Sequence, residues 1–336
     1  MKKWIFVLSL VLSFNAYAEI VTGEKCGDDC TWTLDTETGK LIISGTGNMY
    51  NWYEKGWATP WREYGADIQS IVIEGQKKDD NGNVVSGGIT SIGSVAFANL
   101  TALKNIEIAD SVTAIESLAF YQTTALESIS IPDSVTQLSW GPFQCNTSLK
   151  EIIIPDGVTY IPPYCFAQST ALEAVIIGDQ ASVDYGAFEG VSGKIYCTSV
   201  SSCSGKGADD SQIETYTKDK TTDIYQTSDG LYFLSAQDMI NASKAQSDEQ
   251  RAMISCGTDM NVCKAELLKN KGMCVSDECD ALVASANAGK LLKVGSKTYQ
   301  SLDALLKGKY DKRRIYTIDE ANLVAGDKNM VRIKYR

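Results

Sequence analysis

Apolar residues recur along the middle of the chain with a period of 23 residues. Within one unit, the segment 125–131 alternates apolar and polar positions, as a half-buried strand does. The turn sequence Pro132-Asp133-Ser134 then ends the alternation. One unit cannot bury its apolar side chains alone, whereas stacked units bury them as a continuous ladder. The pattern therefore predicts a mainly β solenoid of about five coils over residues 89–196.

The predicted core contains one residue of each column in every unit. Burial of an aliphatic or Phe side chain contributes on the order of 1.5–3 kcal/mol, so this core needs no ligand. The columns are Phe97, Phe120, Phe143, Phe166 and Phe188; Leu103, Leu126, Leu149 and Leu172; Ile108, Ile131, Ile154 and Ile177; and Ile92, Ile115, Leu138, Ile161 and Val183.

These columns resemble a known repeat family. The residues Ser111 to Ile115, Ala119-Phe120, Leu126 and Ile131-Pro132-Asp133 follow the pattern of the BspA-type, or Treponema pallidum-type, leucine-rich repeats. The resemblance covers residues 71–195, and the segments 31–35, 41–47 and 60–62 are similar to the usual start of such proteins. It implies a surface or secreted protein that binds host proteins or other bacteria.

An insertion, residues 76–88, interrupts the first unit. Asn81-Gly82 is a strong hairpin-turn dipeptide, so a projecting hairpin is predicted. A calcium loop is the alternative, because Asp79, Asn81 and Asn83 alternate. That loop would need Gly after the third ligand and Glu at its twelfth position, where Thr90 stands.

The first eighteen residues predict export. Lys2 and Lys3 precede a short apolar stretch, and Ala16-Tyr17-Ala18 forms a small-x-small cleavage site. Cleavage is expected between Ala18 and Glu19. We expect no transmembrane helix in the mature chain, because no other stretch is long and apolar enough.

Two flanks enclose the repeats. Residues 19–75 are predicted to form an N-terminal β cap whose tryptophans (Trp32, Trp52, Trp57 and Trp61) pack the end of the rod. An aromatic carbohydrate platform is the alternative. Residues 197–222, rich in Ser, Gly and Asp, are expected to be a linker.

A small C-terminal α+β module is predicted over residues 223–336. Residues 237–288 have a helical pattern, and residues 291–298, 313–318 and 330–336 look like strands. The last of these alternates apolar with basic residues. It is interpreted as a closing strand or, alternatively, as a secretion or envelope-docking signal.

Ten cysteines favour disulfides in an exported chain. Cys26 with Cys30, and Cys197 with Cys203, are close enough in sequence to pair. For Cys256, Cys263, Cys274 and Cys279 three connectivities are open. A zinc site made of these four is the alternative, although their spacing differs from that of zinc knuckles.

The charge distribution also bears on partners. A net charge of −11 argues against nucleic acid as the main partner. The repeats are acidic and residues 305–336 are basic, which suggests two modules with different surfaces. The period places Glu127, Glu151 and Glu173 in an acidic stripe, which we interpret as a solvated face or, alternatively, as a site for a basic partner.

No catalytic, cofactor-binding or metal-binding residues are assigned. The chain has no histidine, and no GxSxG elbow, P-loop or metal-ligand cluster stands out. We therefore predict a non-enzymatic protein- or glycan-binding adhesion module, periplasmic, secreted or on the outer cell surface. The alternative is a structural envelope protein that the C-terminal module anchors, with the repeats as a spacer. Its ligand is a host or bacterial surface protein or glycan that the sequence leaves unidentified.

Overall fold

The computed structural model describes residues 20–81, 84–220, 222–270, 277–288, 291–294, 297–299, 316–318 and 330–335. The expected cleavage site at Ala18 and Glu19 lies outside these residues. So does Cys274.

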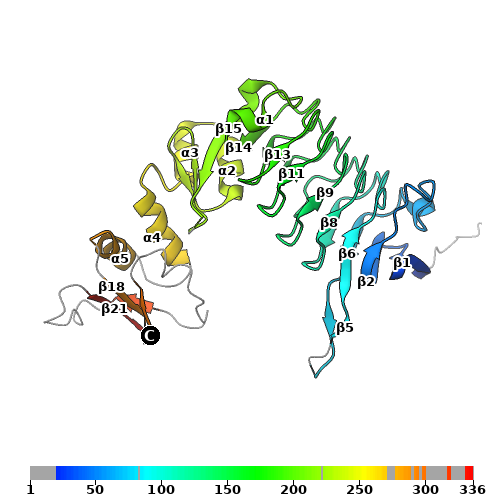
Figure 1. Ribbon diagram of the computed structural model, residues 1–336, viewed down its shortest axis with the longest axis horizontal. Helices are drawn as coiled ribbons and strands as arrows, with labels where there is room; N and C mark the ends of the chain where they lie inside the picture. The colour runs from blue at the N-terminus through cyan, green and yellow to red at the C-terminus, as the bar shows by residue number, and fades with distance from the viewer. Residues whose placement is uncertain are drawn as a thin grey trace, which may run out of the picture.

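The repeats form stacked coils with two parallel strand ladders (Figure 1). One long strand, β2 (Lys40–Met49), begins both ladders, since residues 40–43 pair with β3 and residues 46–48 pair with β6. We number the coils 1 to 7 by their segment in the first ladder. These segments are β2, β3 (Ser70–Ile73), β7 (Asn105–Ile108), residues 128–131, β10 (Glu151–Ile153), β12 (Ala174–Ile176) and β14 (Lys194–Cys197). The second ladder continues from β2 through β6 (Gly88–Ile92), β8 (Ala114–Ile115) and β9 (Gln137–Leu138). In the next two coils β11 (Tyr160–Ile161) and β13 (Ser182–Val183) pair as a separate two-stranded sheet.

A turn around each Phe closes the coil. Backbone hydrogen bonds link successive turns, for example Phe120 N to Pro142 O at 2.9 Å and Phe143 N to Cys165 O at 3.1 Å. Each turn contains two left-handed residues four positions apart, such as Leu118 (φ 56°) and Gln122 (φ 57°). This backbone geometry lets the chain reverse while the ring stays inside the coil.

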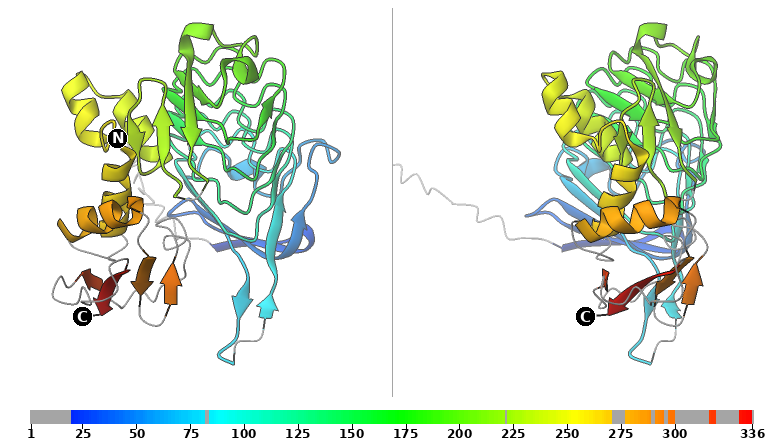
Figure 2. Two further views of the ribbon diagram at one scale, coloured as in Figure 1. Left: turned by 60° about the vertical axis from the view of Figure 1, so that its left-hand side comes forward. Right: turned by 90° about the vertical axis from the view of Figure 1, so that its left-hand side faces the viewer.

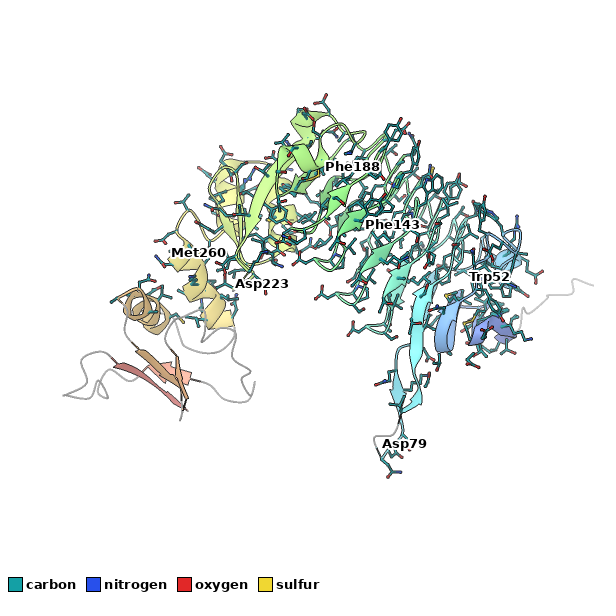
Figure 3. All side chains as sticks on the ribbon, viewed as in Figure 1. Trp52, Asp79, Phe143, Phe188, Asp223 and Met260 are labelled. Carbon is teal, nitrogen blue, oxygen red and sulfur yellow. A yellow bond between two sulfur atoms is a disulfide. The ribbon has the colours of Figure 1, made fainter. Side chains whose placement is uncertain are left out.

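The aromatic rings form a column through the array. Trp61 stacks on Phe97 at 5.8 Å, and the following Phe rings lie 5.6–5.9 Å apart. All five Phe side chains and the four Leu side chains of the predicted core are buried. Figure 3 shows Phe143 and Phe188 inside the coils.

Ile108 differs from the rest of its column because it is only partly buried. The first ladder is interrupted beside it: β7 is an edge strand of its sheet, and residues 128–131 make a single bridge, from Ser128 to Glu151 of β10. Ile131, Ile154 and Ile177 are buried. The interruption lies between coils 3 and 4.

The N-terminal end is closed by β1 (Ile20–Asp35), which pairs antiparallel with β2. Trp32, Trp52 and Trp61 are buried there in edge-to-face contacts of 5.9 and 6.1 Å. The Trp61 Nε1–H donates to the Ala96 carbonyl at 2.9 Å. Trp61 thus covers the first Phe ring of the column.

Residues 197–222 differ from the linker that composition predicts. They contain α1 (Val200–Cys203), a 3-10 turn (Asp210–Gln212) and β15 (Ile213–Lys218), which pairs parallel with β14 and extends the first ladder. Ile213 and Tyr216 are buried in two different core clusters, so this segment is packed on both faces. A few buried side chains outweigh its polar composition.

The chain then turns back through β16 (Tyr225–Thr227) and β17 (Tyr232–Phe233) into α2 (Ala236–Ser243). Ser235 caps α2 by accepting the Asp238 N–H at 3.1 Å. Three helices follow: α3 (Asp248–Ile254), α4 (Met260–Asn270) and α5 (Asp277–Asn287). Figures 1 and 2 show α2 and α3 beside the last coils, while α4 and α5 lie farther away, toward the C-terminal sheet.

The C-terminal strands form a mixed sheet in the order β19-β18-β21-β20. The strands are β18 (Leu291–Val294), β19 (Lys297–Tyr299), β20 (Tyr316–Ile318) and β21 (Met330–Tyr335). Strand β21 is paired on both sides. Its backbone is therefore not free to add to a partner's sheet, whereas a docking strand would need an open edge.

The insertion forms a hairpin of β4 (Lys77–Lys78) and β5 (Val84–Ser86). Figure 3 shows Asp79 near its tip, away from the coils. Ser86 Oγ donates to the Gly45 carbonyl at 2.6 Å, and Lys77 contacts Glu74 at 2.5 Å, so the base of the hairpin is held against coils 1 and 2.

Candidate binding surfaces

The described residues contain no cluster of three or more His, Cys, Asp or Glu side chains that could hold a metal. Within the same residues, no helix is long and apolar enough to cross a membrane. Of the candidate calcium ligands, Asp79 accepts the Asn81 N–H at 2.9 Å as in an Asx turn, and Asn83 lies outside the described residues.

The three glutamates of the expected acidic stripe all contact lysines of this chain. Lys150 lies 2.5 Å from Glu127, and Lys244 of α2 lies 2.5 Å from Glu151 and 3.5 Å from Glu173. The hydrogen bond from Lys150 lowers the pKa of Glu127, and the contact with Glu151 raises the pKa of Lys244. Each glutamate of the stripe is thus paired within the chain, while Glu127 and Glu173 remain more than half exposed.

Helix α2 covers the outward face of the first ladder in its last coils. The outward side chains Ile176, Tyr196 and Tyr216 are buried against Met239 and Ile240. The Tyr216 hydroxyl donates to the Ile177 carbonyl at 2.6 Å, and burial raises its pKa. This packing makes the start of the C-terminal module continuous with the repeats.

The loop between β15 and β16 is tied to the corners of coils 5 and 6. Lys218 contacts Asp156 and lies 3.3 Å from Asp223, while Lys220 lies 3.6 Å from Asp179. Partial burial lowers the pKa of Lys218, but the contacts with Asp156 and Tyr225 outweigh it and raise the pKa overall. Like α2, this loop uses lysines to hold acidic repeat residues.

Coils 1 to 4 keep an uncovered face, which we call the open ladder surface. A hollow of about 360 Å³ marks its boundary with α2, between residues 128–131 on one side and residues 151–153 with Gln237 on the other. Its outward side chains are Lys40, Ile42, Ser70, Val72, Asn105, Glu107, Ser128 and Ser130.

The four N-terminal tryptophans do not form a carbohydrate platform. Trp32, Trp52 and Trp61 are at most 5% exposed, because they cover the end of the Phe column. Trp57 is partly exposed and contacts Tyr121 edge-on at 6.0 Å.

A different set of aromatic side chains is exposed on the repeats, and we call it the aromatic strip. Trp140 (42% exposed), Tyr164 and Tyr185 (65% exposed) follow one another over coils 4, 5 and 6, with ring centroids 5.6 and 5.9 Å apart. Tyr160 (45% exposed) adjoins them through a hydrogen bond to Asp184, whose other carboxylate oxygen accepts the Tyr185 N–H at 2.6 Å.

The 23-residue period did not reveal this strip, because its members belong to adjacent columns. Trp140 and Tyr185 immediately precede a left-handed residue of the Phe turn, whereas Tyr164 occupies that position itself (φ 57°). The sequence feature that could have predicted the strip is an aromatic residue at, or directly before, the first left-handed position of the Phe turn in three successive units.

The cysteines that sequence singled out lie as follows. Disulfides join Cys26 to Cys30, Cys197 to Cys203, and Cys256 to Cys263. Cys279 is also disulfide-bonded. Because Cys256 and Cys263 are bonded to each other, a four-cysteine zinc site does not form. Cys145 and Cys165 are free thiols.

Comparison with known proteins bears on the repeats. Residues 82–194 match the family model described as a BspA type leucine rich repeat region, in six copies. A search of curated proteins found no match.

Solved structures with similarity include a leucine-rich repeat protein from Eubacterium ventriosum, with 20% identity over 63% of this chain and 50% of that chain and a TM-score of 0.45. The leucine rich repeat protein of T. pallidum has 17% identity over 50% of this chain and 89% of that chain, with a TM-score of 0.34. The pneumococcal vaccine antigen PcpA has 18% identity over 54% of this chain and 45% of that chain, with a TM-score of 0.37.

Three observations agree on a leucine-rich repeat architecture: the columns of buried Leu and Ile, the parallel strands, and the residues that match the family model. The strand-rich repeat fold predicted from the 23-residue period is confirmed in this region. The repeat region of this chain belongs to the BspA-type leucine-rich repeat family.

Proposed function

We propose that this chain is an exported or cell-surface binding module that attaches to a protein through its open ladder surface. The carrying observation is that one ladder is covered by α2 in its last coils and exposed in coils 1 to 4. Leucine-rich repeat proteins of this kind are generally binding modules, which supports the proposal.

We also propose the following organisation: a cleaved signal peptide (1–18), an N-terminal cap (19–75), the insertion hairpin (76–88), a solenoid (89–196) and a C-terminal module. The close contacts of residues 197–222 with coil 7 support assigning them to the solenoid rather than to a linker. A periplasmic, secreted or cell-surface location follows from the proposed signal peptide.

The chemistry of the open ladder surface suits a protein partner. At one end Ile42 and Val72 are register neighbours that face outward and remain partly exposed. Glu107 and the small hydroxyl residues Ser128 and Ser130 follow across coils 3 and 4. An apolar patch bordered by polar groups has the arrangement of a protein interface, which has an apolar core and a polar rim.

The boundaries of this surface are also defined. The insertion hairpin rises from coil 2, and Gln237 of α2 borders the hollow at coil 5. In Figures 1 and 2 the hairpin and the C-terminal sheet project to the same side of the array. A partner on the open ladder surface would lie between them.

Charge-bearing substitutions on that surface test the proposal. The mature chain and its variants would be applied to an array of immobilised extracellular proteins and to intact bacterial cells. Val72→Arg and Ser130→Arg each place a bulky, hydrated charge in the expected interface, so we expect loss of capture by at least tenfold, or about 1.4 kcal/mol.

Gln137→Arg is the matched control, because Gln137 is exposed in coil 4 but lies in the second ladder. Capture that is unchanged in both Val72→Arg and Ser130→Arg, or equally reduced in Gln137→Arg, would refute binding at the open ladder surface. Truncation after Lys220 is unsuitable as a test, since it would expose Ile176, Tyr196 and Tyr216.

A further inference from the structure

We propose that the aromatic strip (Trp140, Tyr160, Tyr164 and Tyr185) is a second binding site, and that its ligand is a neutral polysaccharide. The inference rests on the proposed binding role of the chain but uses a different surface from the open ladder. It adds a ligand class that the repeat architecture does not specify.

The spacing of the rings fits a linear chain of sugars. Trp140, Tyr164 and Tyr185 come from three successive coils, with centroid separations of 5.6 and 5.9 Å and successive rings edge to face at interplanar angles of 63° and 89°. Stacked coils repeat by roughly 5 Å, the spacing of neighbouring strands, which is close to the length of one pyranose ring. One sugar unit per coil would therefore stay in register along the strip.

The position of the middle ring is held by the backbone. Gly186 has φ 65°, and a Cβ built there would lie 2.9 Å from Cε1 of Tyr164. The Tyr164 ring therefore lies against a residue without a side chain in the next coil. This contact orders the ring before any ligand arrives, which reduces the entropy lost on binding.

Carboxylates lie at both ends of the strip. Beside Trp140, Ser139 Oγ donates to Glu116 at 2.8 Å, and beside Tyr185 the Tyr160 hydroxyl donates to Asp184. A carboxylate has about four lone-pair sites, so each keeps capacity to accept sugar hydroxyls.

The same charges disfavour an anionic ligand. Glu116 and Asp184 are two negative groups, and Lys206 is the basic residue whose field reaches Asp184. An acidic polysaccharide would meet net repulsion at the strip, whereas a neutral one would not.

The exposed large hydrophobic side chains of the repeats are concentrated at the strip and are all aromatic. Across residues 89–196 the strongly exposed large hydrophobic side chains are Trp140, Tyr160 and Tyr185, with no Leu, Ile, Val or Met among them. The face of an aromatic ring carries negative charge density that attracts the C–H groups of a sugar, and the Tyr hydroxyls add hydrogen bonds.

Affinity electrophoresis of the mature chain tests the assignment. Native gels would contain a soluble glucan, mannan or xylan at graded concentrations, or alginate as an anionic polysaccharide. We expect at least one neutral polysaccharide to retard the wild-type chain, and the double variant Trp140→Ala/Tyr185→Ala to bind it at least tenfold more weakly. Tyr53→Ala, which removes a 60% exposed ring near the N-terminal end, is the matched control and should bind like the wild type.

Any of three results would overturn the proposal: no retardation by any of the neutral polysaccharides, equal retardation of the double variant, or retardation by alginate alone. Thermal unfolding would verify that the variants fold, and Tyr185→Ser, at the most exposed ring, serves if the double variant does not. Ser130→Arg should leave the retardation unchanged. If no neutral polysaccharide retards the chain, but the chain still captures a protein and Ser130→Arg abolishes that capture, the polysaccharide site is refuted and the proposed function is retained.

Discussion

Replacing Phe143 tests whether the ring column stabilises the coils beyond simple burial. Phe143 is fully buried and stacks on Phe120 at 5.7 Å and on Phe166 at 5.9 Å, with interplanar angles of 3° and 5°. Phe143→Ala removes the ring and leaves a cavity, which typically costs about 3–5 kcal/mol. Phe143→Leu keeps most of the apolar volume but loses two ring contacts of about 0.5–1.5 kcal/mol each, so roughly 1–3 kcal/mol is expected.

The matched control is Phe188→Leu at the end of the column. Phe188 is equally buried but has one ring partner among the described residues, Phe166 at 5.9 Å. Its replacement should therefore destabilise the chain about half as much, by roughly 0.5–1.5 kcal/mol. Urea unfolding followed by circular dichroism measures both values, provided that the slopes agree. Equal losses for Phe143→Leu and Phe188→Leu would refute a contribution from stacking and leave burial as the whole effect.

Three further predictions concern single side chains. Gln168 is exposed, and its backbone is in the left-handed region (φ 60°), which glycine adopts without strain. Gln168→Gly should therefore raise the free energy of unfolding by up to about 1 kcal/mol, whereas the β-branched Gln168→Val should lower it. Thermal unfolding of the two variants distinguishes the outcomes. Partial burial raises the pKa of Glu74, but hydrogen bonds from Lys77 and Ser44 outweigh it and lower the pKa overall. The stabilising contribution of the Glu74 carboxylate is therefore present above the ordinary Glu pKa of about 4.3 and disappears as the pH falls through the lowered pKa. Glu74→Gln should lower the free energy of unfolding by up to about 1 kcal/mol at pH 7 and leave it unchanged at strongly acidic pH. A difference in the free energy of unfolding that stays constant with pH would contradict this. Burial raises the pKa of both free thiols, but Cys145 is partly exposed and Cys165 fully buried, so alkylation with peptide mapping should label Cys145 roughly tenfold faster or more in the native protein.

The sequence was most informative where one residue type repeats at one distance. The Phe and Leu columns each specify the same environment several times, so their burial could be predicted without knowing how neighbouring coils meet. The exception, Ile108, shows the limit of this reasoning. Its column position predicts burial, but the interruption between coils 3 and 4 depends on backbone pairing that no single side chain reports.

Contacts between distant segments were not predictable from the period. Lys244 and Glu151 are 93 residues apart in the chain, and Lys218 and Asp156 are 62 apart. The acidic composition of the repeats indicated that basic groups would be attracted to their surface. It did not indicate that lysines of the same chain would supply those groups. Composition was misleading for residues 197–222, where a disulfide and two buried side chains order a polar segment.

The outward positions of the first ladder do contain a signal for where a cover lies. A strand with one solvated face alternates apolar and polar residues, whereas a strand buried on both faces is apolar throughout. Residues 128–131 alternate and their serines are exposed, whereas residues 174–177 are continuously apolar and the outward Ala174 and Ile176 are buried under α2. Residues 152–154 are also continuously apolar, and the outward Ile153 is partly buried against the same cluster. The same continuous pattern occurs at residues 41–43 and 71–73, yet there Ile42 and Val72 remain partly exposed. By the rule that holds in coil 6, coils 1 and 2 have the composition of a covered strand without the cover. This is the physical reason to expect a partner on the open ladder surface at its N-terminal end, and it makes Val72→Arg a more decisive substitution than Ser130→Arg.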